Sequence, residues 1–266
     1  MTNILFLHAH PDDEAIFTGG TIAALAEKGH AITVVFATGG ELGTTKSNDD
    51  LSIVRKEEAN HACSILGVKH VHFLGYHDSG LDKSIMPDNA LALANSDMVS
   101  KQLADILRKQ NIHTVFCDDE YGVYGHPDHV KCHEIALLAA QLHGLDCIVE
   151  TTVDGEYLHF VQSHLVDHAF DAYGIEPDSA LFRVGSNRQH PGLTTVEISS
   201  VVKINGIHLK AKRDAMAAHS SQIPQSSETL LFNDEQFKEV YGLEWFRHVP
   251  IKQSHHAQNS LLDGLE

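Results

Sequence analysis

Over its first 150 residues the chain alternates between strand-like and helix-like segments. Short runs rich in β-branched and aromatic residues, such as Ala31–Ala37 (AITVVFA), favour buried strands. Longer helical stretches follow them, and two of these end at a glycine, Gly67 and Gly144. The expected strands are Asn3–Ala9, Ala31–Ala37, His70–Leu74 and Thr114–Cys117, and the expected helices are 13–28, 51–66, 93–110 and 130–142.

This alternation restricts the topology. Strands and helices joined by short links favour right-handed βαβ crossovers, and hence a parallel sheet covered by helices on both faces. We therefore predict an α/β fold, a Rossmann-like three-layer arrangement around a mostly parallel sheet. Ligands bind such sheets beyond the carboxyl ends of the strands. The loops that lie there are 8–14, 38–50, 75–82 and 118–129.

The second half of the chain is less regular. It shows neither an internal repeat nor a low-complexity linker. Segments 145–160 and 193–206 are strand-like, 161–172 and 207–219 are helix-like, 221–229 is a polar loop, and a polar tail begins at Lys252. We expect a single domain over residues 1–266, with a core at 1–144 and a C-terminal elaboration at 145–266.

Composition argues against several functional classes. The 36 acidic residues outnumber the 19 basic ones, and the net charge of −17 disfavours nucleic acid and anionic membranes as partners. No apolar run approaches the roughly 20 residues of a membrane span. The N-terminus lacks the basic start of a secretory signal, so we expect a cytoplasmic location. The cysteines at 63, 117, 132 and 147 form no C-x-x-C pair, which favours buried reduced thiols.

The first chemically informative cluster is His10-Pro11-Asp12-Asp13-Glu14, where the first strand gives way to a helix. His10 and Asp13 are three residues apart, so their side chains can converge near the helix start. An imidazole and a carboxylate suit a cation such as zinc. Asp12 projects differently and could take a proton from metal-bound water. The alternative is a helix cap with acidic residues placed favourably on the helix dipole.

The second cluster, Tyr124–His129, also follows a strand and opens a helix. His126 and His129 repeat the three-residue spacing, and one of them would complete a set of two histidines and one carboxylate. Such a set leaves a coordination position for water, as a catalytic zinc requires. The other histidine could polarise a substrate carbonyl, with Asp128 fixing its tautomer. A rival pairs His129 with His133, which we expect instead to be a packed or exposed helical residue. The whole cluster could also be a hydrogen-bonded helix cap.

The segments A-H-P-D-D-E at 9–14 and G-H-P-D-H at 125–129 together resemble the LmbE-like, or PIG-L, family of zinc-dependent N-deacetylases. Members act on N-acetylglucosaminyl inositols, N-acetylglucosaminyl malate and chito-oligosaccharides. The resemblance is good over roughly residues 1–140 and sparse afterwards. Further similar segments are T-G-G-E-L-G at 38–43, R-K-E-E-A at 55–59, L-G-V at 66–68, G-Y-H-D-S-G-L at 75–81 and A-A-H-S-S-Q at 217–222.

The resemblance implies a role for nine residues. It assigns Asp12 as general base, and His126, in its protonated form and backed by Asp128, as the group that stabilises the oxyanion. His126 or Asp12 would protonate the leaving amine. The implied metal ligands are His10, Asp13 and His129. The implied substrate contacts are Arg55, Asp78 and Tyr124, although Arg55 could equally be a helix-surface charge and Tyr124 a loop anchor.

We therefore expect a zinc-dependent hydrolase that removes an acetyl group from the amide nitrogen of an N-acetylglucosamine-type sugar. Fe²⁺ is an alternative metal, because this ligand set also suits non-haem iron. The partner would be the small N-acetylated sugar, and a homo-oligomer is compatible with the sequence. The alternatives are an amidase for a larger amide conjugate and a non-catalytic metal or sugar binder. The sequence lacks the G-x-G-x-x-G of dinucleotide-binding enzymes after its first strand, and the G-x-S-x-G of serine hydrolases.

Overall fold

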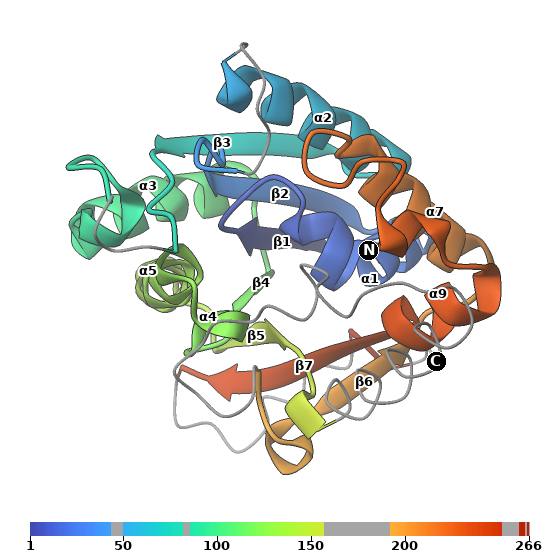
Figure 1. Cartoon of the computed structure of the whole chain (residues 1–266). Coiled ribbons are helices and arrows are strands. Elements are labelled where there is room, and N and C mark those ends of the chain that lie inside the picture. The colour runs from blue at the N-terminus through green and yellow to red at the C-terminus, as the bar shows by residue number, and fades with distance from the viewer. Residues whose placement is uncertain (44–49, 82–85, 157–191, 252–260, 264, 266) are drawn as a thin grey trace.

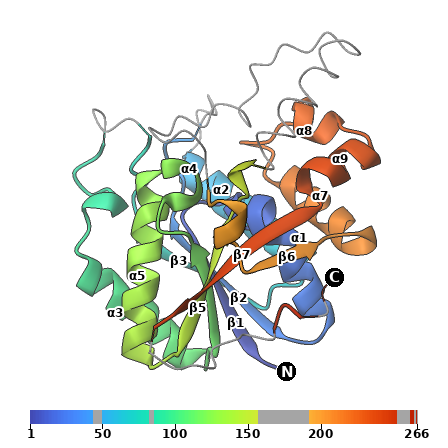
Figure 2. The same ribbon diagram turned by 90° about the horizontal axis from the view of Figure 1, so that it is seen from below.

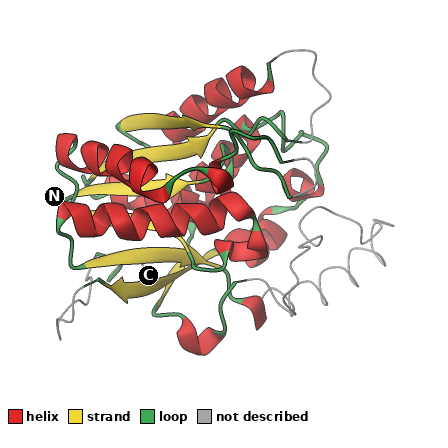
Figure 3. Cartoon of the chain, turned by 90° about the vertical axis from the view of Figure 1, so that its left-hand side faces the viewer, coloured by secondary structure: helices red, strands yellow, loops and turns green. Residues whose placement is uncertain are grey.

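The computed structural model describes residues 1–43, 50–81, 86–156, 192–251, 261–263 and 265. In this part of the chain a seven-stranded sheet has the order β3-β2-β1-β4-β5-β7-β6, with helices packed around it (Figure 1, Figure 3). The strands are β1 (Asn3–His8), β2 (Ala31–Thr38), β3 (His70–Tyr76), β4 (Thr114–Asp118), β5 (Cys147–Thr152), β6 (Ser200–Lys203) and β7 (Leu243–Pro250). This arrangement confirms the predicted α/β fold.

The strands from β1 to β5 pair in parallel, which brings their carboxyl ends to one edge of the sheet. The register of β1 on β2 runs from Asn3 opposite Ala31 to His8 opposite Phe36. In Figure 2 the N-terminus marks one end of the sheet, and α4 (Gly122–Gly125) lies at the other. Residues that directly follow β1 and β4 therefore share one end of the molecule.

Helices cover both faces of the sheet, and each face has its own apolar core (Figure 2). Side chains of a strand point alternately to opposite faces: Ile4 and Phe6 enter one core, whereas Leu5 and Leu7 enter the other. One face is covered by α1 (Asp13–Glu27), α2 (Leu51–Ile65), α7 (Gly206–Ala218) and α9 (Asp234–Tyr241), and the other by α3 (Ser96–Lys109) and α5 (Pro127–His143). Shorter helical turns are η2 (Leu91–Leu93), η4 (Thr195–Glu197) and α8 (Glu228–Leu231).

The C-terminal part of the chain extends this same sheet. The strand β7 was not predicted from sequence, and it pairs antiparallel with both β5 and β6. Its second residue, Glu244, is buried but forms an ion pair with Lys212 at 2.8 Å and accepts the backbone N–H groups of Gly20 and Thr21. These contacts let a charged residue occupy a buried strand position, because a buried charge must be paired.

Three other boundaries differ from the predictions. The helix expected at 130–142 begins earlier, because Pro127 occupies its first turn, where a missing N–H costs little. The strand-like segment 193–206 is a strand only at Ser200–Lys203, and the loop expected at 221–229 already contains the start of α8. The helix predicted at 207–219 is α7. The helix predicted at 161–172 lies outside the described residues.

All four cysteines are free thiols, as predicted, and Cys147 is the one that is not fully buried. Burial raises the pKa of the Cys117 thiol well above its ordinary value. Across the described ranges, no helix combines the length and the apolar character that crossing a membrane demands.

Candidate functional site

The first His-Pro-Asp turn follows β1 and contains a strained residue. Asp12 has φ 118° and ψ −29°, a conformation that non-glycine residues rarely adopt. The helix α1 starts only after it, so Pro11 lies outside the helix. The Asp12 side chain makes no capping hydrogen bond. The simple helix-cap interpretation therefore does not account for this carboxylate.

The second turn joins β4 to α5 through the short helix α4. Here His126 is the N-cap residue, and its Nδ1 accepts the backbone N–H of Asp128 at 3.1 Å. Gly122 precedes it with φ +67°, and a Cβ at this position would lie 2.8 Å from the backbone nitrogen of Val130. Glycine is thus required for the turn to fold back onto α5.

The two turns bring together the three residues expected to ligate a metal. Asp13 Oδ2 lies 3.5 Å from Nδ1 of His10 and 3.4 Å from Nε2 of His129. The ring centroids of His10 and His129 are 5.2 Å apart, and all three side chains are buried. Burial alone would raise the pKa of Asp13, but the neighbouring imidazoles hold it well below its ordinary value. A charged carboxylate between two imidazoles is a donor set suited to zinc.

The cluster also extends to the opposite side of the His10 ring. Nε2 of His10 lies 3.2 Å from Asp128 Oδ2 and 3.4 Å from Asp78 Oδ1. Among the described residues, two groups have potential ligand atoms that all lie within 4.8 Å of one another: His10, His126 and His129, and His10, Asp78, His126 and Asp128. Asp13 belongs to neither group, although one of its oxygens contacts both His10 and His129. The cluster can therefore hold a metal, and the contacts alone leave two alternatives to the predicted ligands.

Asp118, which the sequence analysis missed, supports His129 from behind. Its Oδ2 lies 3.2 Å from Nδ1 of His129, close enough for an ion pair although the two atoms are not aligned as a hydrogen bond. Carboxylates commonly orient metal-binding histidines in this way. The hydroxyl of Tyr124 lies 3.2 Å from Nε2 of the same ring. The sequence signal for Asp118 was its place directly after the strand predicted at Thr114–Cys117, where the loop 118–129 begins; in the structure it is the last residue of β4.

Asp12 faces a cation. Its Oδ2 lies 3.1 Å from the guanidinium of Arg55, which also donates hydrogen bonds to the backbone oxygens of Gly40 and Pro11. Burial raises the pKa of Asp12 to about 6, with Arg55 lowering it and the Asp13 carboxylate raising it. Arg55 was expected either to contact the sugar or to be a surface charge. It is a buried residue of α2 that contacts Asp12, so it is not a surface charge, and its contact with the sugar stays a prediction.

His126 and Asp128 are arranged differently from the expectation. Burial, with His10 and His129 close by, lowers the pKa of His126 to about 3, which disfavours the protonated form that we expected. The Asp128 carboxylate accepts hydrogen bonds from the backbone and the hydroxyl of Ser79 and contacts His10. Asp128 contacts His126 through its backbone N–H, which donates to Nδ1 of the His126 ring.

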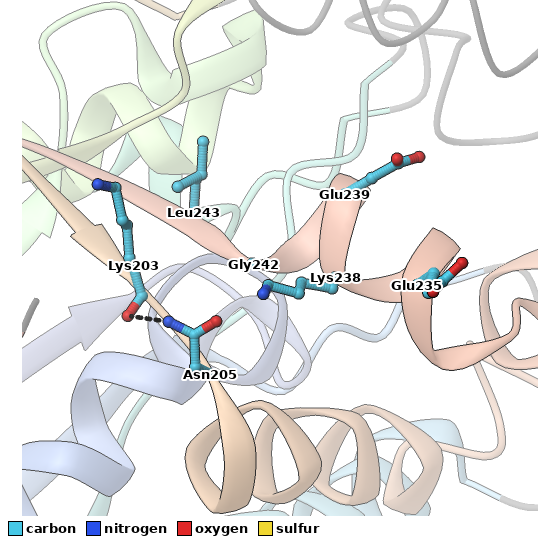
Figure 4. Close-up of a pocket in the computed structure, with 7 residues that line it drawn as sticks. All are labelled: Lys203, Asn205, Glu235, Lys238, Glu239, Gly242 and Leu243. Carbon is cyan, nitrogen blue, oxygen red and sulfur yellow. Dashed lines mark hydrogen bonds between the residues drawn. The ribbon is translucent and has the colours of Figure 1, made fainter.

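Two further features lie outside the cluster. The rival ligand His133 is half-buried and contacts the backbone oxygen of Asp118 and the carboxylate of Glu150, in agreement with a packed helical residue. A surface pocket of about 540 Å³ lies beside β6 and α9 (Figure 4). None of the candidate residues lines this pocket. Its lining consists of Lys203, Asn205, Glu235, Lys238, Glu239, Gly242 and Leu243.

Comparison with known proteins agrees with this geometry. The family model described as "PIG-L: GlcNAc-PI de-N-acetylase" matches residues 5–140, which is just over half of the chain and includes both turns. The chain belongs to the PIG-L family. The matched residues, 5–140, include all nine candidate residues.

Two similar relatives are each named 1D-myo-inositol 2-acetamido-2-deoxy-alpha-D-glucopyranoside deacetylase. The protein from Rhodococcus opacus is 30% identical over 254 residues, which cover 87% of this chain and 86% of the relative. The protein from Saccharopolyspora erythraea is 32% identical over 243 residues, which cover 83% of this chain and 77% of the relative. Both alignments extend well beyond residue 144, where the sequence patterns were least informative.

Solved structures support the fold. The N,N'-diacetylchitobiose deacetylase from Pyrococcus horikoshii superposes with a TM-score of 0.60 at 24% identity, covering 94% of this chain and 84% of that one. A zinc-inhibited form of a teicoplanin deacetylase superposes with a TM-score of 0.60 at 16% identity, covering 95% of this chain and 100% of that one. The architecture, including its C-terminal part, is therefore shared with known proteins.

Proposed function

We propose that this PIG-L family member is a metal-dependent N-deacetylase that hydrolyses the acetamide of an N-acetylglucosamine-type sugar to a free amine and acetate. The observation that carries the proposal is the position of Asp12. This carboxylate lies next to the cluster of His10, Asp13 and His129 and has a pKa of about 6, close to the ideal for a general base near neutral pH. The names of the relatives support an acetylated glucosamine as the substrate.

We propose His10, Asp13 and His129 as the metal ligands, with Asp118 orienting His129. Zn²⁺ is the preferred ion because its usual catalytic sites have three nitrogen and oxygen ligands from the protein, and Fe²⁺ is the alternative. When bound, such a metal supplies a Lewis acid that polarises the acetyl carbonyl and acidifies a water molecule.

Asp12 is suited to remove the proton of the attacking water. At neutral pH a carboxyl with a pKa of about 6 is mainly ionised and can accept this proton. Once protonated, the same carboxyl can return the proton to the leaving amine. The Arg55 guanidinium, 3.1 Å away, keeps the base ionised and fixes its direction.

His126 is suited to donate a hydrogen bond to the oxyanion without being charged. Its Nδ1 accepts the backbone N–H of Asp128, so the proton of the neutral ring must be on Nε2. That nitrogen faces the cluster, 3.9 Å from Asp78 Oδ1. A preorganised donor of this kind contributes about 100- to 1,000-fold to kcat. Asp78 and Tyr124 are our candidates for contacts with the sugar.

The proposal is tested by measuring free amine and acetate released by the zinc-loaded protein. The substrates are N-acetylglucosaminyl inositol, N-acetylglucosaminyl malate, N,N'-diacetylchitobiose and N-acetylglucosamine, with the Asp12→Ala variant as the control. We expect release from at least one glycoside, and its near-complete loss in the variant. Binding without turnover, or turnover that persists in Asp12→Ala, would contradict the proposal.

We also propose that residues 1–266 form one domain. The support is the single sheet, in which β5 of the C-terminal part pairs directly with β4 of the core, and β7 and then β6 continue the sheet from β5. A single cooperative thermal transition is expected by calorimetry, and two separate transitions would contradict it.

A further inference from the structure

The segment A-A-H-S-S-Q at 217–222 takes no part in the proposed metal site, yet one of its residues is buried beside that site. His219 follows α7, and its Nε2 lies 2.6 Å from Glu14 Oε1. Both side chains are 0% exposed. Glu14 directly follows Asp13 in α1, so a residue of the C-terminal part contacts the helix that begins at the site.

The second oxygen of Glu14 acts on the backbone of Asp12. Glu14 Oε2 accepts the Asp12 N–H at 3.0 Å. Asp12 is the residue with φ 118°, a strained conformation that persists only where its surroundings enforce it. The Arg55 guanidinium fixes the carboxylate of Asp12, and Glu14 fixes its backbone. The Glu14 carboxylate thus bridges the His219 ring and the backbone of Asp12.

The neighbours of His219 are attached to the core as well. The hydroxyl of Ser220 donates to Glu58 Oε1 at 2.9 Å, and the backbone and hydroxyl of Ser221 donate to the two oxygens of Glu58 at 2.7 and 2.6 Å. Glu58 lies on α2, the helix that also carries Arg55. The segment after α7 is therefore fixed to both helices that hold Asp12, which leaves His219 little freedom to move.

We propose that His219, acting through Glu14, is a positioning residue that holds Asp12 in the orientation needed for the reaction. This inference rests on the deacetylase function proposed above. Loss of the imidazole leaves the buried carboxylate of Glu14 without the side chain that pairs with its Oε1. An unpaired buried charge is costly, so we expect the Glu14 side chain to move. Glu14 then releases the Asp12 N–H, and Asp12 relaxes from its strained conformation. A displacement of about 1 Å at a reacting group can cost about 100-fold in rate.

The test compares three variants in the zinc-loaded full-length protein. His219→Ala is expected to lower kcat by about 10- to 100-fold, with KM and zinc content close to those of the wild type. His219→Gln is expected to restore most of kcat, because its side-chain amide can still donate to Glu14. Lys212→Met is the matched control on the same helix. This variant removes a buried ion pair with Glu244. Glu244 accepts a backbone N–H in the middle of α1 and does not contact Asp12.

The outcomes separate positioning from stability. A lower Tm in both His219→Ala and Lys212→Met, with kcat reduced only in His219→Ala, supports the proposal. Unchanged kcat in His219→Ala, or equal losses of kcat in both, overturns it. If His219→Ala does not fold, Glu14→Leu and Glu14→Gln test the same bridge. The glutamine retains an acceptor for the Asp12 N–H and should keep most of kcat, whereas equal kcat in these two variants contradicts the proposal.

A crystal structure of His219→Ala provides a readout that does not depend on activity. We expect loss of the hydrogen bond between the Asp12 N–H and residue 14, and a shifted Asp12 carboxylate. An unchanged Asp12 would overturn the proposal. If the wild type releases no amine from any glycoside, the proposed function fails, whereas this structure still decides whether His219 positions Asp12.

Discussion

Removing the charge of Arg55 should shift the acid limb of the pH profile of kcat/KM to higher pH. The guanidinium lies 3.1 Å from Asp12 Oδ2, and the two side chains are only 4% and 18% exposed. A cation this close lowers the pKa of a carboxyl by about 1–3 units. Without it the pKa of Asp12, about 6 in the intact protein, should rise to about 7–9. The base must be ionised to work, so activity is lost as pH falls through this pKa.

The size of the effect follows from the ionised fraction. With a pKa of about 6, roughly nine-tenths of Asp12 is ionised at pH 7, and with a pKa of about 7–9 the fraction is between about one half and one hundredth. We therefore expect Arg55→Met to lose about 2- to 100-fold in kcat/KM at pH 7 and to recover at higher pH. Wild type and variant carry the same metal, so the difference between their profiles isolates the effect of Arg55.

The assay measures kcat/KM for amine release between about pH 5 and pH 10. Arg55→Lys keeps the charge and should keep the acid limb near that of the wild type. Arg108→Met removes an exposed arginine of α3 and controls for the change in net charge. An acid limb in Arg55→Met that coincides with the wild type, with activity lowered equally at every pH, would refute the reasoning.

Three further predictions concern the base, the metal and the core. Asp12→Ala should lose about 100- to 10,000-fold in kcat and retain its zinc by elemental analysis; near-normal turnover would exclude Asp12 as the base. Asp118→Asn should weaken zinc binding about 10- to 100-fold in equilibrium dialysis, and unchanged affinity would contradict its role behind His129. Phe246→Ala, in the buried part of β7, should destabilise the protein by about 3–5 kcal/mol in urea unfolding. The exposed Val201→Ala should change stability by less than about 0.5 kcal/mol, and equal effects would contradict a core role for β7.

The parallel part of the fold was predictable because its signals are local. A continuous apolar run such as Ala31–Ala37 specifies a buried strand wherever it lies in the chain. The strand β7 was not predictable in this way. Its buried Glu244 is tolerated only because Lys212 and the N–H groups in the middle of α1 pair with it. Those partners are 32 and more than 200 residues away in sequence. The local sequence of β7 therefore does not show that its glutamate can be buried in a strand.

The same distinction applies to the site. Both His-Pro-Asp turns follow strands of the parallel sheet, and the strand-end rule was enough to predict that they would meet. The orientation of individual groups was not predictable. The contact of Arg55 with Asp12 depends on how α2 packs, and the pKa of His126 depends on burial and on two neighbouring rings. The pairing of Glu14 with His219 joins residues 205 positions apart.

The central claim is that the two turns bind one divalent ion through His10, Asp13 and His129. Its most direct test is a crystal structure of the zinc-loaded protein with anomalous data collected at the zinc absorption edge. We predict one peak within about 2.0–2.2 Å of a ligand atom from each of these three residues. A peak bound by His126, Asp78 and Asp128 in place of Asp13 and His129 would contradict the account.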